Sequence, residues 1–326
     1  MLYFVTYPGW DGHWHKYYNQ AVCSELKRHG IEYLQIVTDY TSPDIESSLR
    51  KLQEIRSSTR DVWLFSMAQN PAIDLVEHRA GRKYGHIHGL TCFPFEPAVL
   101  QGVDLQENRR FAHYDGLFLS SRWSYDNAVR SYDEHAGRFV LTGFPMDYSV
   151  YEPYLDVQKD ENLVAFNQRF SCERLPLIEI EVARQLISSG YEVWHLHAQD
   201  ERMVAAICPR ARRLREIGMR VGLQFVANAT KEQYHQNLAR AATVVTTSIC
   251  DNLPVSLIEA IYLGAVPIAP DAMCFPEIVH RDNLYSPYEL AQILRLVRCR
   301  PKRHHSITGL AKEAVVERYI EAMELT

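Results

Sequence analysis

The chain reads Thr247-Ser-Ile-Cys-Asp-Asn-Leu-Pro-Val-Ser-Leu-Ile-Glu-Ala-Ile-Tyr-Leu-Gly-Ala-Val-Pro267 in its most informative stretch. The apolar residues that lead into this stretch predict a buried strand over Thr243–Thr247, which ends in small polar residues. Pro254 suits the first turn of a helix, because that position needs no N–H partner. We therefore predict a helix over Val255–Leu263, followed by a second strand over Val266–Ala269. A strand–helix–strand unit of this kind is typical of a parallel sheet.

The same alternation extends in both directions along the chain. In the first half we predict strands and helices at Leu2–Thr6, His13–Arg28, Tyr33–Val37, Asp44–Ile55, Val62–Ser66, Gly116–Ser120, Trp123–Tyr132 and Phe139–Thr142. In the second half we predict them at Leu163–Phe166, Leu177–Ser188, Glu192–Leu196, Glu201–Ile217, Leu223–Val226 and Lys231–Leu238. A polar stretch with many turn formers separates the two series, and we place the domain boundary near Pro153. The predicted fold class is α/β, with two Rossmann-like domains whose parallel sheets face each other across a cleft.

Size and composition limit the classes of function. A chain of 326 residues suits two domains, and its net charge of -5 gives no general attraction to nucleic acid or anionic membranes. We find no signal peptide and no apolar run near the ~20 residues of a spanning helix. The seven cysteines are scattered without a CxxC pair, which favours reduced thiols in a cytoplasmic enzyme over disulfides or a zinc site.

Two carboxylates stand out in the opening stretch. Asp251 and Glu259 are separated by seven residues, one in the loop and one in the predicted helix. A carboxylate accepts hydrogen bonds from two hydroxyls at once, as vicinal diols of a sugar or ribose require. The spacing is equally compatible with a simpler interpretation, in which Asp251 or Asn252 caps the helix and Glu259 is an exposed acid.

Two arginines follow another predicted strand, in the segment Val164-Ala-Phe-Asn-Gln-Arg-Phe-Ser-Cys-Glu-Arg-Leu-Pro176. Guanidinium groups suit diphosphate oxygens, so Arg169 and Arg174 are candidate phosphate ligands. Without further context, two solvated surface arginines would be the simpler interpretation.

In the first half, a glycine-containing loop with Gly12 and His13 follows the first strand, which is a weak signal for a phosphate loop. His86 and His88 alternate near a strand end. A metal pair is conceivable there, but no third ligand is visible, and ordinary polar roles are favoured. For the segment Ser120-Ser121-Arg122, a helix N-cap with a solvated Arg and a ligand contact are both open. Basic groups near residues 210–215 and 295–303 favour solvated helix faces, although they would also suit a polyanionic acceptor.

The C-terminal half resembles the retaining glycosyltransferases of the GT-B architecture. Asp251 and Glu259 resemble the family's E-x7-E region, with Asp in place of the first Glu. Asn167-x-Arg169 and the second basic residue resemble the group of tRNA-queuosine mannosyltransferase-like proteins. The stretches Lys231–Ser248, Phe275-Pro-Glu-Ile and Leu284-Tyr-Ser-Pro-Tyr-Glu-Leu extend the likeness, which covers roughly Leu163 to Pro301 and the first half only loosely.

The resemblance implies a role for each candidate residue. It implies that Arg169 and Arg174 hold the diphosphate of a nucleotide sugar, and that Glu259 binds the ribose. It also implies that His88 and Asp251 orient the sugar and that Asn252 binds the donor. Gly12 and His13 would contact the donor or the acceptor. The residues would divide into an acceptor domain (1–153), a nucleotide-sugar domain (154–305) and a C-terminal helix (306–326) that packs back toward the first domain.

The implied function is transfer of a hexose, with retention, from a donor of the GDP-mannose or UDP-glucose type to a hydroxyl. Family members use no enzyme nucleophile, cofactor or required metal, because arginines and helix N-termini neutralise the diphosphate. The acceptor stays open between a modified nucleoside in tRNA, a modified base in DNA, and a small molecule or glycan. Two other functions also stay open: a sugar-nucleotide epimerase of the same architecture, and an inactive binding scaffold.

Overall fold

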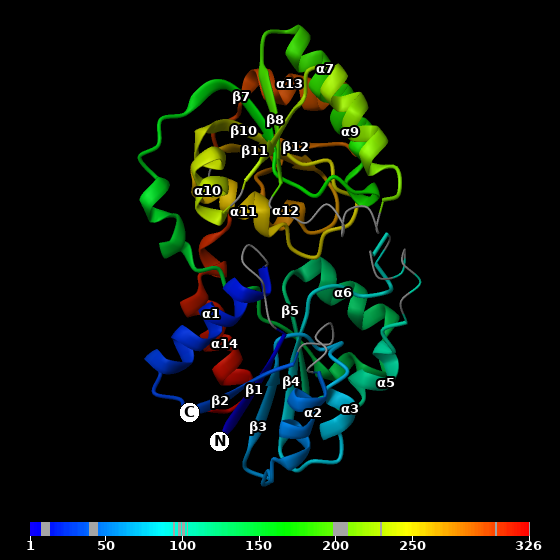
Figure 1. Cartoon of the computed structure of the whole chain (residues 1–326), viewed down its shortest axis with the longest axis vertical. Coiled ribbons are helices and arrows are strands. Elements are labelled where there is room, and N and C mark those ends of the chain that lie inside the picture. Colours follow the sequence, from blue (N-terminus) through cyan, green and yellow to red (C-terminus); the bar gives the residue numbers. More distant parts are fainter. Residues whose placement is uncertain are drawn as a thin grey trace. The chain divides into compact units, whose positions relative to one another are not determined.

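Two six-stranded parallel sheets organise the chain in the computed structural model (Figure 1). The structure describes residues 1–7, 14–38, 45–93, 95–96, 99, 102, 104–197, 208–228, 230–303 and 305–325. The chain divides into unit 1, which contains Met1–Phe93, Asp104–Asp147 and Thr308–Thr326, and unit 2, which contains Pro94–Val103 and Tyr148–Ile307. The α/β fold class predicted from the sequence is confirmed.

Unit 1 is a doubly wound sheet with strand order β2-β1-β3-β4-β5-β6. Its strands are β1 (Leu2–Thr6), β2 (Tyr33–Val37), β3 (Val62–Phe65), β4 (Arg82–Ile87), β5 (Gly116–Leu119) and β6 (Phe139–Leu141). Its helices are α1 (Trp14–Arg28), α2 (Ile45–Glu54), α3 (Ile73–Val76), α5 (Glu107–Phe111), α6 (Arg122–Ser131) and α14 (Lys312–Ala322), with the 3₁₀ turns η1 (Asp133–Arg138) and η5 (Thr308–Leu310). β1, β3 and β5 are buried along their whole length, as strands covered on both faces of a parallel sheet must be.

The C-terminal helix α14 belongs to unit 1, although it follows unit 2 in the sequence. Its apolar face buries Tyr319, whose ring stacks on Phe118 with 4.5 Å between ring centroids. The hydroxyl of Tyr18 on α1 lies 3.4 Å from that of Tyr319. Lys312 pairs with Asp147 at 2.8 Å, so packing and charge both hold this helix on unit 1.

Unit 2 has the strand order β12-β11-β10-β7-β8-β9. Its strands are β7 (Asp160–Phe166), β8 (Glu192–His197), β9 (Gln224–Ala227), β10 (Ala241–Val245), β11 (Val266–Pro270) and β12 (Leu284–Tyr285). Its helices are α7 (Pro176–Ser188), α9 (Ala211–Arg220), α10 (Lys231–Arg240), α11 (Val255–Tyr262), α12 (Phe275–Ile278) and α13 (Leu290–Cys299), with the 3₁₀ turns η2 (Tyr148–Tyr154), η3 (Cys172–Arg174) and η4 (Arg281–Asn283). α7 packs against both α9 and α13, whereas α10 and α11 both contact η2 (Figure 1).

The strand order of unit 2 reverses between β7 and β10. From β7 the chain moves outward through β8 and β9, then returns to add β10, β11 and β12 on the other side. At such a switch point the loops that leave the two central strands diverge, and ligands of open α/β sheets bind there. The two loops are residues 167–175, after β7, and residues 246–254, after β10.

The observed elements differ from the predicted ones mainly at their ends. The longer segment of unit 2 begins at Tyr148, whereas the sequence placed the boundary near Pro153. Helix α9 runs over Ala211–Arg220, later than the predicted Glu201–Ile217, of which residues 201–207 lie outside the described part of the chain. Strand β10 begins and ends two residues before the predicted Thr243–Thr247.

Candidate functional site

The buried amide of Gln168 joins the loops that follow β7 and β10. Its Oε1 accepts the backbone N–H of Thr247 at 3.1 Å, which fixes the orientation of the amide because that group can only donate. Its Nε2 then donates to Thr247 Oγ1 and to the carboxylate of Glu179, both at 2.9 Å. Glu179 is itself 2.6 Å from His195 Nδ1, and neither side chain is exposed. This network holds the two loops at fixed positions.

Further contacts join the same loops. Ile249 donates its backbone N–H to the carbonyl of Glu173 at 2.9 Å. Asn167 donates to the carbonyl of Ser256 at 2.5 Å, which ties the first loop to the start of α11. Between the loop and α7, Leu175 has a left-handed backbone (φ 49°), which costs a non-glycine residue roughly 1 kcal/mol and persists only where the surroundings impose it.

The two loops bring together two arginines and two acids, Arg169, Arg174, Glu173 and Asp251, which we call the arginine–acid cluster. Arg169 Nη2 lies 3.1 Å from Glu173 Oε1, and Arg174 Nε lies 3.7 Å from the same oxygen. Arg174 Nη1 pairs with Asp251 Oδ2 and also donates to Ser248 Oγ. Glu173 is fully buried, whereas Arg174 and Asp251 keep 13% and 12% of their side-chain surface exposed.

Burial and charge act differently on the two arginines. Burial lowers the pKa of Arg169, and the neighbouring positive charge of Arg174 lowers it further. For Arg174, burial also opposes the charged form, but the carboxylates of Asp251 and Glu173 outweigh it and raise the pKa. The two carboxylates therefore hold Arg174 firmly in its charged form.

Glu259, on α11, is the centre of a second group. Its Oε1 lies 2.8 Å from Lys231 Nζ, and it accepts the hydroxyl of Tyr151 at 3.3 Å. Its Oε2 accepts the hydroxyl of Tyr234 at 2.9 Å. His235 Nε2 lies 3.8 Å from Oε1. Since Glu259 is buried, the predicted alternative of an exposed acid on the helix surface is wrong.

The charge of Glu259 is stabilised by its neighbours. Burial alone would raise the pKa of this carboxyl, but Lys231 and His235 outweigh burial and lower the pKa to about 2. Asn167, in the same loop as Arg169, donates its Nδ2–H to the hydroxyl of Tyr234 at 3.5 Å and so connects this loop with the group around Glu259. Glu259 is thus a preformed, ionised acceptor near the switch point of unit 2.

The start of α11 differs from the prediction. Pro254 is the N-cap of this helix and no side chain caps it, so the prediction that Asp251 or Asn252 caps it is wrong. The carboxylate of Asp251 pairs with Arg174 instead, since an ion pair with a buried guanidinium is stronger than a cap hydrogen bond. Asn252 is half-buried between Asp251 and the helix.

In unit 1, His88 directly follows the end of β4. Its Nε2 lies 2.5 Å from the carbonyl of Ser66 and 3.3 Å from Nδ1 of His86. A carbonyl can only accept, so Nε2 of His88 carries a proton and Nδ1 of His86 is an acceptor. His86 Nε2 faces the carbonyl of Gly143 at 3.3 Å, so it also carries a proton. The Nε2 protons of both rings are thus directed at backbone carbonyls.

Burial keeps His86 neutral. The side chain is fully buried, and burial lowers its pKa to about 3, despite the opposing hydrogen bond with Gly143. Aromatic rings surround the pair, with Tyr18 5.2 Å from His86 and 5.4 Å from His88 between centroids. Among the residues that the structure describes, no group of three or more His, Cys, Asp or Glu side chains is arranged to hold a metal ion.

Of the other sequence candidates in unit 1, Gly12 and His13 lie outside the described residues. Ser121 caps α6: its hydroxyl accepts the N–H of Ser124 at 3.1 Å, and Ser124 returns a bond to Ser121 N–H at 3.2 Å. The cap interpretation of Ser121 is confirmed.

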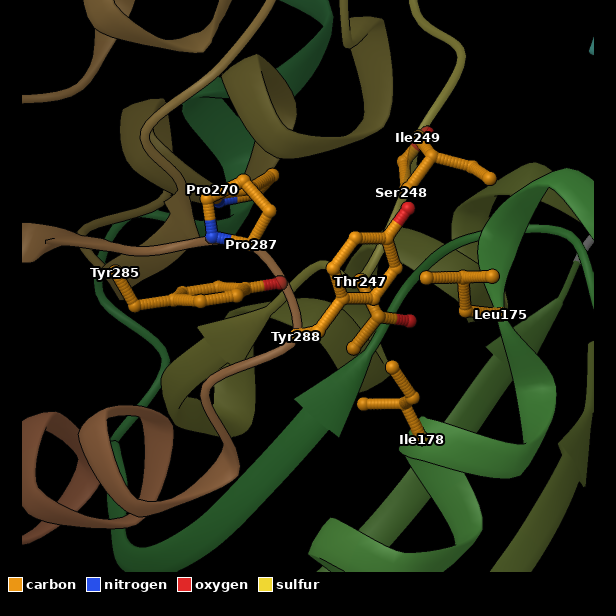
Figure 2. Close-up of a pocket in the computed structure, with 9 residues that line it drawn as sticks. All are labelled: Leu175, Ile178, Thr247, Ser248, Ile249, Pro270, Tyr285, Pro287 and Tyr288. Atoms are coloured by element: carbon orange, nitrogen blue, oxygen red, sulfur yellow. The ribbon is translucent and has the colours of Figure 1, made fainter.

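A small hollow lies beside the arginine–acid cluster, at the ends of β10 and β11 (Figure 2). Its volume is about 220 Å³ when the open solvent is included. Its lining is mostly apolar: Leu175, Ile178, Thr247, Ser248, Ile249, Pro270, Tyr285, Pro287 and Tyr288. Ser248 belongs to the hollow and also contacts Arg174, so the hollow and the cluster share one wall.

Sequence reasoning missed several residues of the site. Lys231 and Tyr234, which hold Glu259, were noted only as part of a family-like stretch, although three-residue spacing on a helix places them on one face. Tyr151 and Glu173 carried no recognisable signal, because their partners are distant in sequence or lie in an irregular loop.

Comparisons with known proteins support the fold. No family model matches the chain. A segment of 56 residues is 34% identical to tRNA-queuosine alpha-mannosyltransferase of Drosophila melanogaster; it covers 17% of this chain and only 15% of that protein. Among solved structures, sucrose-phosphate synthase of Thermosynechococcus elongatus aligns with a TM-score of 0.67 at 12% identity, over 99% of this chain and 94% of that one.

Two further structures align over nearly the whole chain. HepE of Anabaena, solved in complex with UDP, has a TM-score of 0.62 at 14% identity and covers 99% of this chain and 94% of its own. UDP-GlcNAc 2-epimerase of Methanocaldococcus jannaschii has a TM-score of 0.64 at 11% identity and covers 100% and 99%. The fold is GT-B. Within the described part of the chain, no helix combines the length and apolar character needed to cross a bilayer.

Proposed function

We propose that the chain is a glycosyltransferase that moves a hexose from a nucleoside diphosphate sugar to a hydroxyl acceptor, with retention at the anomeric carbon. The observation that carries the proposal is the pair of arginines in the arginine–acid cluster, next to the buried, ionised Glu259 at the switch point of unit 2. Cations and a diol acceptor at one switch point match the diphosphate and the ribose of such a donor.

In this proposal Arg169 and Arg174 bind the diphosphate. As the bond between sugar and phosphate breaks, negative charge grows on the diphosphate, and fixed guanidinium groups stabilise it. Their positions are set in advance by Glu173 and by the hydrogen bonds between the two loops. Because two guanidinium groups supply this charge, we propose that the reaction requires no metal ion and no cofactor.

Glu259 would bind the ribose of the donor. Its Oε2 accepts the hydroxyl of Tyr234, and a carboxylate oxygen has two lone pairs, so one ribose hydroxyl can be added without displacing the tyrosine. Lys231 keeps the carboxylate charged and in place. Glu259 would then act by binding, without direct contact with the reacting bond.

The sugar would be oriented by Asp251 and His88, with Asn252, Gly12 and His13 as further donor or acceptor contacts. In the reaction, the acceptor oxygen forms a bond to the anomeric carbon on the face from which the diphosphate leaves. The acceptor proton passes to the departing diphosphate oxygen, so that no separate enzyme base is needed.

For the donor we propose the GDP-mannose or UDP-glucose type, and for the acceptor a modified nucleoside in tRNA. The tRNA acceptor and the mannosyl donor follow the short similarity to a tRNA-queuosine alpha-mannosyltransferase. The UDP-sugar alternative follows the UDP complex of a structural neighbour. A modified base in DNA is the alternative acceptor that the same test separates from tRNA.

The test is release of nucleoside diphosphate from a panel of UDP-, GDP- and ADP-sugars, each with and without pooled tRNA or DNA. Release from one donor that depends on one acceptor pool is expected, with the product's anomeric configuration read by NMR. Binding of nucleotide without release under any acceptor would instead indicate an inactive scaffold.

A sugar-nucleotide epimerase is the second candidate, because an epimerase structure aligns with the full length of the chain. The same panel separates the two functions. An epimerase converts its sugar nucleotide without any acceptor, whereas a transferase releases diphosphate in proportion to the acceptor that it glycosylates.

A further inference from the structure

The arginine–acid cluster is neutral as it stands. Arg169 and Arg174 contribute two positive charges, and Glu173 and Asp251 contribute two negative ones. A diphosphate that enters this site therefore meets a cation that is already paired. For the diphosphate to bind an arginine, one of the two acids has to leave its ion pair.

Glu173 is fixed in place. Its side chain is fully buried, accepts the hydroxyl of Ser171 at 2.6 Å, and contacts both arginines through the same oxygen. Its backbone carbonyl is held by Ile249 N–H. An acid with these contacts acts as the permanent counterion of the arginines.

Asp251 is less confined. It lies in the loop before α11 and keeps 12% of its side chain exposed. Its carboxylate pairs with Nη1 of Arg174, which also donates a hydrogen bond to Ser248 Oγ. A phosphate oxygen that binds Nη1 competes with the carboxylate of Asp251 for the same N–H groups, and the two anions repel each other at such short range.

We propose that Asp251 is a specificity-determining residue that selects a nucleoside diphosphate sugar over the bare nucleoside diphosphate by competing for Arg174. When a sugar is present, its hydroxyls give the displaced carboxylate new donors. When the sugar has been transferred, those donors are gone, the carboxylate returns to Arg174, and the nucleoside diphosphate is released. The inference rests on the proposed function and adds a reason for product release.

The experiment is calorimetric titration of the full chain with UDP, UDP-glucose, GDP and GDP-mannose, in EDTA so that the charge of each probe is defined. Asp251→Asn removes the competing charge at nearly constant shape. It is expected to bind UDP or GDP about tenfold more tightly than the wild type, a value between those of exposed and buried ion pairs. The preference for the nucleotide sugar over the diphosphate is expected to fall by at least the same factor.

Two variants control this experiment. Asp251→Glu keeps the charge and is expected to restrain diphosphate binding as the wild type does. Asp271→Asn removes a charge from an exposed residue that directly follows β11, at the same edge of the sheet, and is expected to leave diphosphate affinity within about twofold. Thermal unfolding by circular dichroism checks that each variant is folded.

The outcomes are distinct. Equal or weaker diphosphate binding by folded Asp251→Asn, or equal tightening in Asp271→Asn, would overturn the inference and leave the proposed function standing. If the wild type and every folded variant bind none of the four probes, the proposed function fails and the inference falls with it. Tighter diphosphate binding by Asp251→Asn, without tightening in Asp271→Asn, supports both the proposed function and the inference.

Discussion

The described residues at the carboxyl edges of the two sheets differ in their chemistry. In unit 2 this edge carries the ionised groups Arg169, Arg174, Asp251 and Glu259, each paired with a group of opposite charge. In unit 1 the corresponding edge carries the neutral ring of His86, which contacts His88, the carbonyl of Gly143 and the hydroxyl of Ser120. In the proposed function, this difference would assign the charged part of the donor to unit 2 and contacts with hydroxyls to His88 in unit 1.

The largest expected effect comes from removing the firmly charged cation of unit 2. Arg174→Ala should lower kcat/KM for the donor by about 10²–10³-fold, because a guanidinium aimed at the leaving diphosphate stabilises charge that develops in the transition state. The measurement is diphosphate release at varied donor concentration. Arg174→Lys, which keeps the charge but loses the fork, should retain part of the activity.

Arg281→Ala is the matched control for Arg174. Its side chain is 89% exposed on the 3₁₀ turn η4 and lies in the same unit. A surface substitution of this kind is expected to change kcat/KM by no more than about twofold. If Arg174→Ala behaved as this control does, the charged edge of unit 2 would have no part in the reaction.

The second prediction concerns the ionised Glu259. Its folded pKa of about 2 lies below the ordinary value of 4.5, so it contributes stability that is present above pH 4.5 and is lost as the pH falls toward 2. Glu259→Gln should therefore lower the free energy of unfolding by about 3 kcal/mol at pH 6, since each pKa unit corresponds to 1.36 kcal/mol. Urea unfolding at pH 6 and pH 3 measures both the loss and its decline.

The exposed Glu152→Gln on η2 serves as the control, with little change at either pH. A loss for Glu259→Gln that is the same at both pH values would contradict an ionised, charge-stabilised Glu259. Because this variant also affects stability, nucleotide affinity has to be measured below its unfolding temperature.

Much of the fold could be predicted, because long apolar runs and turn residues are local signals. The limits of β1 (Leu2–Thr6) and β2 (Tyr33–Val37) were predicted correctly. The cap of α11 was not, because Asp251 is drawn to Arg174, a residue 77 positions away. Local propensity favours the cap, but a long-range ion pair outweighs it.

The site was predictable only in part, for a related reason. Residue types made Arg169, Arg174 and Glu259 candidates, and the resemblance to the GT-B glycosyltransferases selected them. The structure places the two arginines in one cluster. The supporting residues, such as Gln168, act through contacts with several elements at once. No pattern in a single segment encodes such contacts.

The third prediction tests the neutral edge of unit 1. The folded pKa of His86, about 3, lies below its ordinary value of 6.5, so between these values the unfolded state binds more protons and stability falls as the pH falls. Between pH 6.5 and pH 4.5 this amounts to about 2–3 kcal/mol. His86→Phe should lower stability at pH 7, since it leaves the Gly143 carbonyl without its partner, but it should flatten this pH dependence.

Urea unfolding at pH 7, 5.5 and 4.5 gives the slope for the wild type and for His86→Phe. The exposed His29 provides the comparison, and His29→Phe should leave the slope as it is in the wild type. Equal slopes for the wild type and His86→Phe would mean that His86 takes up protons in the folded state, and the contrast between the two edges would disappear.

The smallest expected effect compares helix caps in the two units. Ser121 caps α6 in unit 1, and Thr230 caps α10 in unit 2 by accepting Gln233 N–H at 3.2 Å. Alanine at either position should cost about 1 kcal/mol of stability, as measured by urea unfolding.

Only Thr230→Ala should also weaken nucleotide binding, by a factor of roughly two to five. The cap immediately precedes Lys231, and the bond of Lys231 to Glu259 needs the first turn of α10 in place. Equal losses of nucleotide affinity in both variants would show that binding follows global stability. The pairing of Lys231 with Glu259 would then have no separate effect on nucleotide binding.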